Sequence, residues 1–137
     1  MKIVVDTNVL VSGLLSPYRA PGEIVRMIAS DHLQLCFDAR IVTEYREVLL
    51  RPKFKFDKHH VAYFLEQIES CGELVAALPL KDLLPHPEDQ SFLEVAVSGN
   101  VPFLVTGNIN HFPKNHYHSV QIVSPNKFLD LYRKELG

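Results

Sequence analysis

Residues 2–8 read Lys2-Ile3-Val4-Val5-Asp6-Thr7-Asn8, a short apolar run that carries an acidic side chain to the point where the backbone has to turn. Because the run is continuous and not alternating, it is typical of a strand buried on both faces, as in the centre of a parallel sheet. Asp6 then lies at the carboxyl end of that strand, where open α/β sheets place their ligand crevice. The alternative, equally compatible with these residues alone, is that Asp6, Thr7 and Asn8 only cap the following helix.

The size and composition of the chain fit one globular domain. It has 137 residues, of which 47% are hydrophobic and 22% are charged, and these values are ordinary for a domain with its own core. The formal net charge of -2 argues against a generally basic nucleic-acid-binding protein, although a local basic groove is compatible with it. We therefore expect a single domain over residues 1–137.

Cysteines and apolar stretches indicate where the protein works. Cys36 and Cys71 show neither a Cys-x-x-Cys spacing nor a disulfide framework, so we expect two free thiols in a reducing compartment. The apolar stretch from Val9 to Leu15 is interrupted by polar and small residues and is too short to cross a bilayer. The sequence predicts neither a signal peptide nor a membrane span, and hence a cytoplasmic location.

Apolar runs alternate with helical patterns along the chain. Besides the run at residues 2–5, strands are predicted at residues 33–37, 73–78, 102–105 and 120–123. Helices are predicted at residues 9–15, 21–29, 41–50, 61–68 and 90–98, and after Ser124-Pro125, with Asp57 as the cap of the fourth. This alternation favours βαβ units with right-handed crossovers, and thus an α/β fold around a parallel sheet.

The segment from Arg51 to His60 is the most basic in the chain and contains two aromatic residues, Phe54 and Phe56. Lysines beside aromatics can hold single-stranded nucleic acid through phosphate contacts and base stacking, which makes Lys53 and Lys55 candidate RNA contacts. The more common alternative is a loop between two helices whose phenylalanines fill the edge of the core.

Three acidic residues fall where such a fold could bring them together: Asp6 after the first strand, Glu44 on the polar side of a helix, and Asp89 at the start of a later helix. Mg²⁺ and Mn²⁺ prefer oxygen ligands and are commonly held by a few carboxylates, waters and substrate phosphate. The chemistry expected of such a site is phosphodiester hydrolysis, in which a metal activates water and no nucleophilic serine or cysteine is needed.

With these residues in place, the chain resembles the PIN-domain nucleases, particularly the toxin components of prokaryotic toxin–antitoxin pairs. The resemblance covers nearly the full length, and the order and spacing of several motifs carry it. They are Val4-Val5-Asp6-Thr7-Asn8, Glu44-Tyr45-Arg46-Glu47-Val48-Leu49 with Arg51-Pro52-Lys53-Phe54, Pro87-Glu88-Asp89-Gln90-Ser91-Phe92-Leu93-Glu94, Leu104-Val105-Thr106-Gly107-Asn108 and Ile122-Val123-Ser124-Pro125.

The resemblance implies a three-layer α/β/α sandwich with a central parallel sheet and metal-dependent cleavage of RNA. On this likeness Asp6, Glu44 and Asp89 match the first three acids of the metal site, with Asn8 and Thr106 beside them as polar support. It also implies an antitoxin protein as a possible partner. Whether the chain forms a homodimer is not decided by the sequence.

The chain departs from the pattern at positions that bear on activity. Asn108 and Asn110 stand where the family usually has aspartate, and His86 stands where related proteins often carry an acid. An amide oxygen can ligate Mg²⁺, but it brings no negative charge and cannot act as a general base. We therefore expect weaker metal binding than the family pattern implies.

Two functions follow from these residues. The leading one is an endoribonuclease that cuts single-stranded RNA with one or two Mg²⁺ or Mn²⁺ ions at Asp6, Glu44 and Asp89, with a weakened acidic site. The alternative is a PIN-fold module that binds RNA or a partner protein without cleaving, which Asn108 favours. A zinc site at His111, His116 and His118 is a minor candidate, because no cysteine or acid lies near them in the sequence.

Overall fold

The central sheet is largely parallel and has the first strand near its middle. In the computed structural model, which describes residues 1–136, six strands are arranged in the order β3-β2-β1-β4-β6-β5. The edge strand β5 pairs antiparallel with β6, and the other pairs are parallel. The strands are β1 (Lys2–Val5), β2 (Gln34–Phe37), β3 (Glu73–Leu74), β4 (Phe103–Val105), β5 (His116–Tyr117) and β6 (Val120–Val123).

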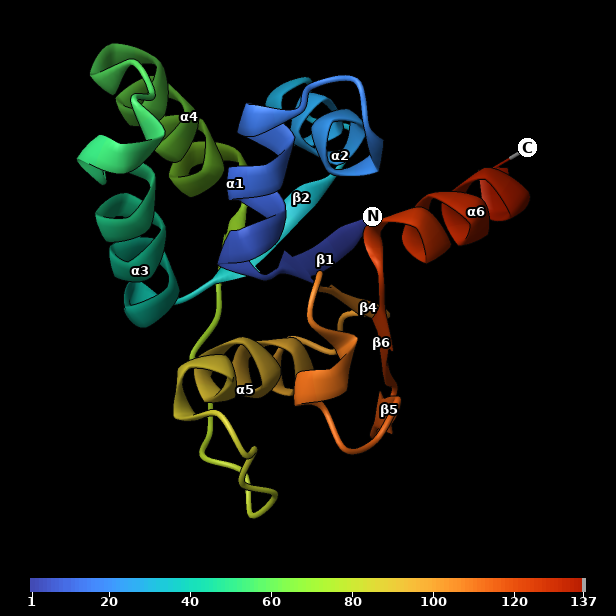
Figure 1. The fold of residues 1–137 in the computed structure, drawn as a ribbon. Coiled ribbons are helices and arrows are strands. Elements are labelled where there is room, and N and C mark those ends of the chain that lie inside the picture. The colour runs from blue at the N-terminus through green and yellow to red at the C-terminus, as the bar shows by residue number, and fades with distance from the viewer. Residues whose placement is uncertain (137) are drawn as a thin grey trace.

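Helices lie on both faces of this sheet, as Figure 1 shows, with α1 and α2 on one side and α5 on the other. The helices are α1 (Thr7–Leu15), α2 (Ala20–Ala29), α3 (Ala39–Leu49), α4 (Lys58–Cys71), α5 (Gln90–Ser98) and α6 (Pro125–Leu136). Short 3₁₀ turns are η1 (Pro52–Phe54), η2 (Pro87–Asp89) and η3 (Ile109–His111). The α/β fold with a mostly parallel sheet between helices is thus confirmed.

The strand β1 is buried on both faces, as its continuous apolar run predicts. Ile3, Val4 and Val5 are fully buried, and β1 pairs with β2 on one side and with β4 on the other. Since parallel neighbours end at the same edge of the sheet, the residues after β1 and β4 are brought side by side. This edge carries the candidate site.

All six predicted helices are confirmed, and side-chain caps explain where α3 and α4 begin. The Asp38 carboxylate accepts the Ile41 N–H at the start of α3. The Asp57 carboxylate accepts the N–H groups of His59 and His60 at the start of α4. Such side-chain acceptors satisfy backbone donors that the first turn of a helix leaves free.

The strand predicted at residues 73–78 is much shorter than expected. Only β3 pairs in the sheet, and the chain then leaves it to run beside α5. There the Leu78 N–H donates to Ser98 Oγ at 2.9 Å and the Leu80 N–H to Glu94 Oε2 at 3.3 Å. Because helix side chains accept these N–H groups, the segment needs no neighbouring strand.

The loop predicted before the last strand contains an unpredicted strand, β5. It forms a hairpin with β6 that turns at His118 and Ser119, where His118 has a positive φ of 55°. With two residues, β5 is too short to show an alternating pattern in the sequence.

The connection between α1 and α2 is held close to both helices. A Cβ atom at Gly22 would lie 2.1 Å from the Pro17 carbonyl oxygen, and one at Gly13 would lie 2.6 Å from the Pro21 carbonyl oxygen. Glycine at these two positions therefore lets the backbones of the two segments approach closely. Any larger residue would push them apart.

Two further sequence predictions concern the thiols and the apolar stretches. Cys36 and Cys71 are both free, Cys36 being buried. Within the described part of the chain, no helix has the length and apolar character needed to cross a membrane.

Candidate active site

A cleft of about 310 Å³ opens where β1 and β4 end. Asp6, Thr7 and Asn8 line it from the start of α1, and Asn108 lines it from the turn after β4. Its other walls come from α1, from α3 and from the three 3₁₀ turns. These walls are made by Val11, Ser12, Val48, Phe54, Glu88, Asp89 and His111.

Asp6 lies at the bottom of this cleft and is only 7% exposed. It occupies the N-cap position of α1, but its side chain makes no capping hydrogen bond. Instead, its Oδ2 accepts a hydrogen bond from the Thr106 hydroxyl at 2.8 Å. The structure therefore favours the cleft-facing interpretation of Asp6 over the simple helix cap.

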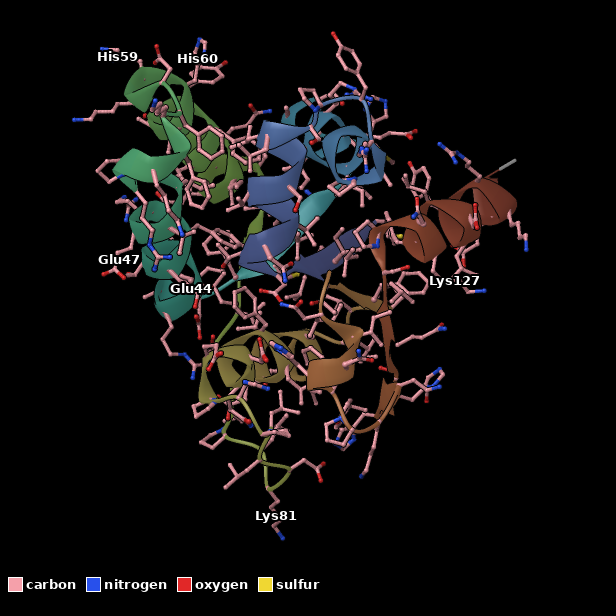
Figure 2. The ribbon with its side chains drawn as sticks, viewed as in Figure 1. Glu44, Glu47, His59, His60, Lys81 and Lys127 are labelled. Atoms are coloured by element: carbon pink, nitrogen blue, oxygen red, sulfur yellow. The ribbon has the colours of Figure 1, made fainter. Side chains whose placement is uncertain are left out.

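Glu44 lies on α3, on the side toward α5, whereas Glu47 points outward (Figure 2). The Glu44 carboxylate accepts a hydrogen bond from the Thr7 hydroxyl. Because Thr7 is the residue after Asp6, this bond ties α3 to the start of α1. Glu44 does not line the cleft and reaches its rim only through the bond to Thr7, so the structure brings Asp6 and Asp89 together in the cleft but not Glu44.

Asp89, at the end of η2, is 4% exposed and faces the cleft. Its Oδ2 lies 3.0 Å from the His111 Nδ1. The His111 ring in turn stacks on His86, with ring centroids 3.9 Å apart. These contacts hold the Asp89 carboxylate from the side of the cleft opposite α1.

The three carboxyl groups are electrostatically coupled. Burial raises the pKa of Asp6 to about 6; the Thr106 hydrogen bond opposes this increase, and repulsion from Asp89 and Glu44 adds to it. Burial and the nearby Asp89 charge also raise the pKa of Glu44. Burial raises the pKa of Asp89, although His111 limits the increase. A bound cation would relieve this repulsion, because it favours the charged form of all three groups.

The donor set fits Mg²⁺ or Mn²⁺ better than a metal that needs an enclosing protein cage. Across residues 1–136, no three His, Cys, Asp or Glu side chains are close enough together to enclose a metal ion by themselves. Mg²⁺ commonly takes one or two carboxylates and keeps several waters. Asp6 and Asp89 facing one cleft meet that requirement.

The turn after β4 is fastened to the turn after β1. The Gly107 N–H donates to Asn8 Oδ1 at 3.2 Å, and the Asn108 N–H donates to Thr106 Oγ1 at 3.0 Å. Thr106 is fully buried. Its hydroxyl accepts from the Asn108 N–H and donates to the Asp6 carboxylate, and so joins the two turns. Asn108 lines the cleft, whereas Asn110 is exposed on η3.

The basic segment reaches the cleft through one side chain. Phe54 lines the cleft and stacks on Phe56, with centroids 5.5 Å apart, and Phe56 packs against the core. Lys53 Nζ lies 5.0 Å from the Phe54 ring centroid, and Lys55 is exposed. Both sequence interpretations of this segment are thus compatible with its position.

The three histidines of the zinc alternative are engaged separately. His111 pairs with Asp89, His116 Nδ1 at the start of β5 lies 3.3 Å from the Oδ1 of the preceding Asn115, and His118 lies in the hairpin turn. None of them belongs to a metal-binding group within residues 1–136. This arrangement gives the zinc alternative no support.

The sequence predicted Thr106 beside Asp6, and the Thr106 hydroxyl does donate to the Asp6 carboxylate, but it did not predict Thr7 and His111 as the partners of Glu44 and Asp89. Thr7 follows Asp6 directly, so its place in the same motif could have indicated a role. The contact of His111 with Asp89 joins residues from η3 and η2, and no periodic signal in the sequence predicts such a pairing.

Comparison with known proteins identifies the family. The PIN domain family model matches residues 2–110. The chain belongs to the PIN domain family. This PIN domain match includes Asp6, Glu44, Asp89 and Asn108 and ends before the β5–β6 hairpin.

A relative of this PIN domain is the uncharacterized protein MJ1680 of Methanocaldococcus jannaschii. The two are 21% identical over 144 residues, covering 98% of this chain and 93% of the relative. PIN domains are generally nucleases and generally use divalent metals such as Mg²⁺, so the chain has a nuclease-type fold.

Proposed function

We propose that the chain is a Mg²⁺- or Mn²⁺-dependent endoribonuclease that cleaves single-stranded RNA. The observation that supports this proposal is the convergence of Asp6 and Asp89 on one cleft, with Glu44 at its rim and the pKa values of all three raised. Buried like charges are costly unless they serve a ligand, and a divalent cation with a phosphate is the ligand that this arrangement suits.

In this proposal Asp6 and Asp89 hold the cation. Glu44 contributes a third negative charge at the rim of the cleft. A Mg²⁺ or Mn²⁺ ion held there would supply positive charge that neutralises the phosphate and favours attack by water on the phosphodiester. Thr106 and His111 orient the first two carboxylates through the hydrogen bonds described above, and Thr7 orients the third. Such fixed side-chain partners keep the ligand oxygens in place.

A second candidate is a PIN-fold module that binds RNA or a partner protein without cleaving it. Asn108 favours this candidate, because it lines the cleft at the position where an aspartate would add a negative charge. Both candidates share the cleft and differ in catalysis.

A role as the toxin of a toxin–antitoxin pair extends the first candidate and rests on the resemblance of the sequence alone. It is tested by inducing expression in a bacterial host. Growth arrest that Asp6→Asn abolishes supports the toxin role, and unimpaired growth with the native chain contradicts it.

A cleavage assay on labelled single-stranded RNA separates the two candidates. The native chain should cleave the RNA when Mg²⁺ or Mn²⁺ is present, and cleavage should stop when a chelator is added. The Asp6→Asn and Asp89→Asn variants should cleave at least about 100-fold more slowly. Asp130→Asn, which removes an exposed acid on α6, serves as the matched control and should keep activity. RNA that is bound and stays intact with the native chain would support the non-catalytic module instead.

A further inference from the structure

A second hollow, larger than the cleft, lies next to it. It has a volume of about 620 Å³ and is bounded by the end of α1, the connection to α2, and the start of α6. Ser12 lines both this hollow and the cleft. Ser12 also lies about 9 Å from Asp6 along the axis of α1, so a chain-like ligand passing over the acids can continue into the hollow.

The hollow differs from the cleft in charge. The cleft is lined by three acids, Asp6, Glu88 and Asp89. Among the described residues that line the hollow, by contrast, Arg19 alone carries a charge, and Ser16 and Asn126 add polar groups. A guanidinium beside hydroxyl and amide groups suits a phosphate that is not shared with a metal.

The residue before Arg19 in the chain, Tyr18, is aromatic and lies at the edge of the hollow rather than in its lining. Tyr18 is 97% exposed, so almost none of its ring is used for packing within the chain. An exposed aromatic next to a cation is the pair of groups with which proteins hold single-stranded nucleic acid, through base stacking and a phosphate contact.

The connection that carries both residues has a fixed shape. The Arg26 guanidinium donates to the Pro17 carbonyl oxygen, and the Arg19 N–H donates to the Ser16 carbonyl oxygen at 3.2 Å. Gly22 lets α2 approach Pro17 at a distance that any Cβ would prevent. Tyr18 and Arg19 are therefore presented from a backbone that is already ordered, which lowers the entropy cost of binding.

We propose that this hollow is a second RNA subsite, which holds nucleotides on one flank of the phosphate at Asp6 and Asp89. Arg19 contacts a flanking phosphate, and Tyr18 stacks on a flanking base. Calling the ligand a substrate rests on the proposed function. Binding of single-stranded RNA at this subsite does not require that it be cut.

The subsite is tested by measuring RNA affinity in a chain that cannot cleave. In the Asp6→Asn background, binding of a labelled oligoadenylate is compared for Tyr18→Ala, Tyr18→Phe, Arg19→Ala and Arg19→Lys. Tyr18→Ala should weaken binding about ten-fold, and Tyr18→Phe, which keeps the ring, should not. Affinity falls as salt rises, and Arg19→Ala should make this negative slope of log affinity against log salt shallower by about 0.7. Arg19→Lys, which keeps the charge, should leave the slope unchanged.

Matched controls lie on other parts of the surface. Tyr63→Ala removes another exposed aromatic, on α4. Lys81→Ala removes a cation from the loop after β3, at the opposite end of the molecule from the connection between α1 and α2 (Figure 2). Controls that weaken binding as much as Tyr18→Ala and Arg19→Ala, or subsite variants with unchanged affinity and salt slope, would overturn the proposal.

The same chains separate the subsite from the proposed activity. If the otherwise native chain leaves RNA intact while Tyr18→Ala still weakens RNA binding, the proposed nuclease activity is wrong and the proposed subsite is supported. If the chain cuts RNA and the Tyr18 and Arg19 variants bind and cut like the native chain, the subsite is wrong and the nuclease stands.

Discussion

Asp6 is held in an environment that opposes its negative charge. It is almost fully buried, with Asp89 and Glu44 close enough to raise its pKa further. The Thr106 hydroxyl offsets only part of this cost, because the pKa still rises from 3.8 to about 6. Side chains kept at such a cost are typical of functional sites.

Asp6→Asn should therefore stabilise the metal-free chain at neutral pH. Well below pH 3.8, the pKa of Asp6 in the unfolded chain, Asp6 is protonated in both the folded and the unfolded chain and its burial carries no electrostatic cost. As pH rises to about 6 the unfolded chain loses the proton first, so native stability falls by up to about 3 kcal/mol. The asparagine variant lacks this decrease. Urea unfolding of both chains at pH 3 and pH 7.5, with chelator present, measures the difference.

The expected pattern is equal stability at the lower pH and a more stable variant at the higher pH. Added Mg²⁺ should stabilise the native chain more than the variant, because a ligand that binds the folded form stabilises it. An Asp6→Asn chain that is less stable than the native chain at pH 7.5 would contradict the picture of a strained carboxylate.

Asn108→Asp should strengthen metal binding, since it places a carboxylate on the wall of the cleft without changing side-chain volume. Two opposite charges about 4 Å apart attract by about 4 kcal/mol at an effective dielectric constant of 20, before desolvation is subtracted. We expect Mg²⁺ affinity to rise roughly ten-fold, and cleavage to rise with it. Isothermal titration with Mg²⁺ or Mn²⁺ and the RNA assay measure the two effects.

Asn110→Asp is the matched control, because it adds the same charge two residues away at an exposed position. It should change affinity less than Asn108→Asp. Combining Asn108→Asp with Asp6→Asn should remove the gain. Unchanged metal binding in Asn108→Asp would show that position 108 does not act on the cation.

Among the site residues, those that follow strands, Asp6 and Thr106, could be placed from the sequence, whereas the partners of Glu44 and Asp89 could not. A β-branched run gives the end of a strand, and the end of a strand gives the position of Asp6. The His111 contact with Asp89 depends on how two 3₁₀ turns pack, which no local pattern encodes.

At the scale of elements, the basic segment from Arg51 to Lys58 combines a core contact with an open surface. Phe56 packs against the core, while Phe54 reaches the cleft and Lys53 lies over its ring. A short 3₁₀ turn, η1, carries Lys53 and Phe54. The segment can therefore be a structural loop and an RNA contact at once.

Replacing Lys53 and Lys55 by glutamine should weaken RNA binding and flatten its salt dependence. For single-stranded RNA, removing one lysine–phosphate interaction should reduce the slope of log affinity against log salt by about 0.7. Lys81→Gln, on the distant loop, is the control for a general decrease of positive charge. A slope that stays constant in the double variant would leave this segment with its structural role only.

Strand lengths show where sequence reasoning failed at this scale. The pattern from Glu73 to Leu78 is apolar enough for a strand, yet only two of its residues pair in the sheet. Ser98 of α5 accepts the Leu78 N–H, which a neighbouring strand would otherwise bind, and Glu94 accepts the Leu80 N–H just beyond the predicted strand. Hydrogen bonds to side chains so distant in sequence cannot be read from the segment itself.

Across the whole molecule, a partly buried ion pair joins α3 to α5. Arg40 of α3 contacts Asp38, and its Nη1 lies 2.9 Å from the Glu94 Oε1 on α5. Burial alone would raise the pKa of Glu94, but hydrogen bonds from Arg40, the Leu80 N–H and Gln90 lower it below its ordinary value. The pair thus fixes α5, and with it the preceding Asp89, relative to α3.

Arg40→Met should destabilise the chain by about 1–3 kcal/mol at pH 7, because it leaves the buried Glu94 carboxylate with fewer donors. The destabilisation should shrink as pH falls through the lowered pKa of Glu94, where this carboxylate becomes protonated. The double variant Arg40→Met with Glu94→Gln should recover part of the stability. Thermal unfolding at pH 7 and pH 4 tests this, and equal destabilisation at both would contradict it.

The pairing of β1 with β4 also has a consequence for biosynthesis. Asp6 and Thr106, which share a hydrogen bond, lie 100 residues apart in the chain. At about 5–20 residues per second, a ribosome needs roughly 5–20 s to translate from one to the other. Throughout that interval the nascent polypeptide lacks β4, Thr106 and one wall of the cleft. Messenger RNA beside the emerging chain is therefore exposed to a completed site only after most of the domain has left the ribosome.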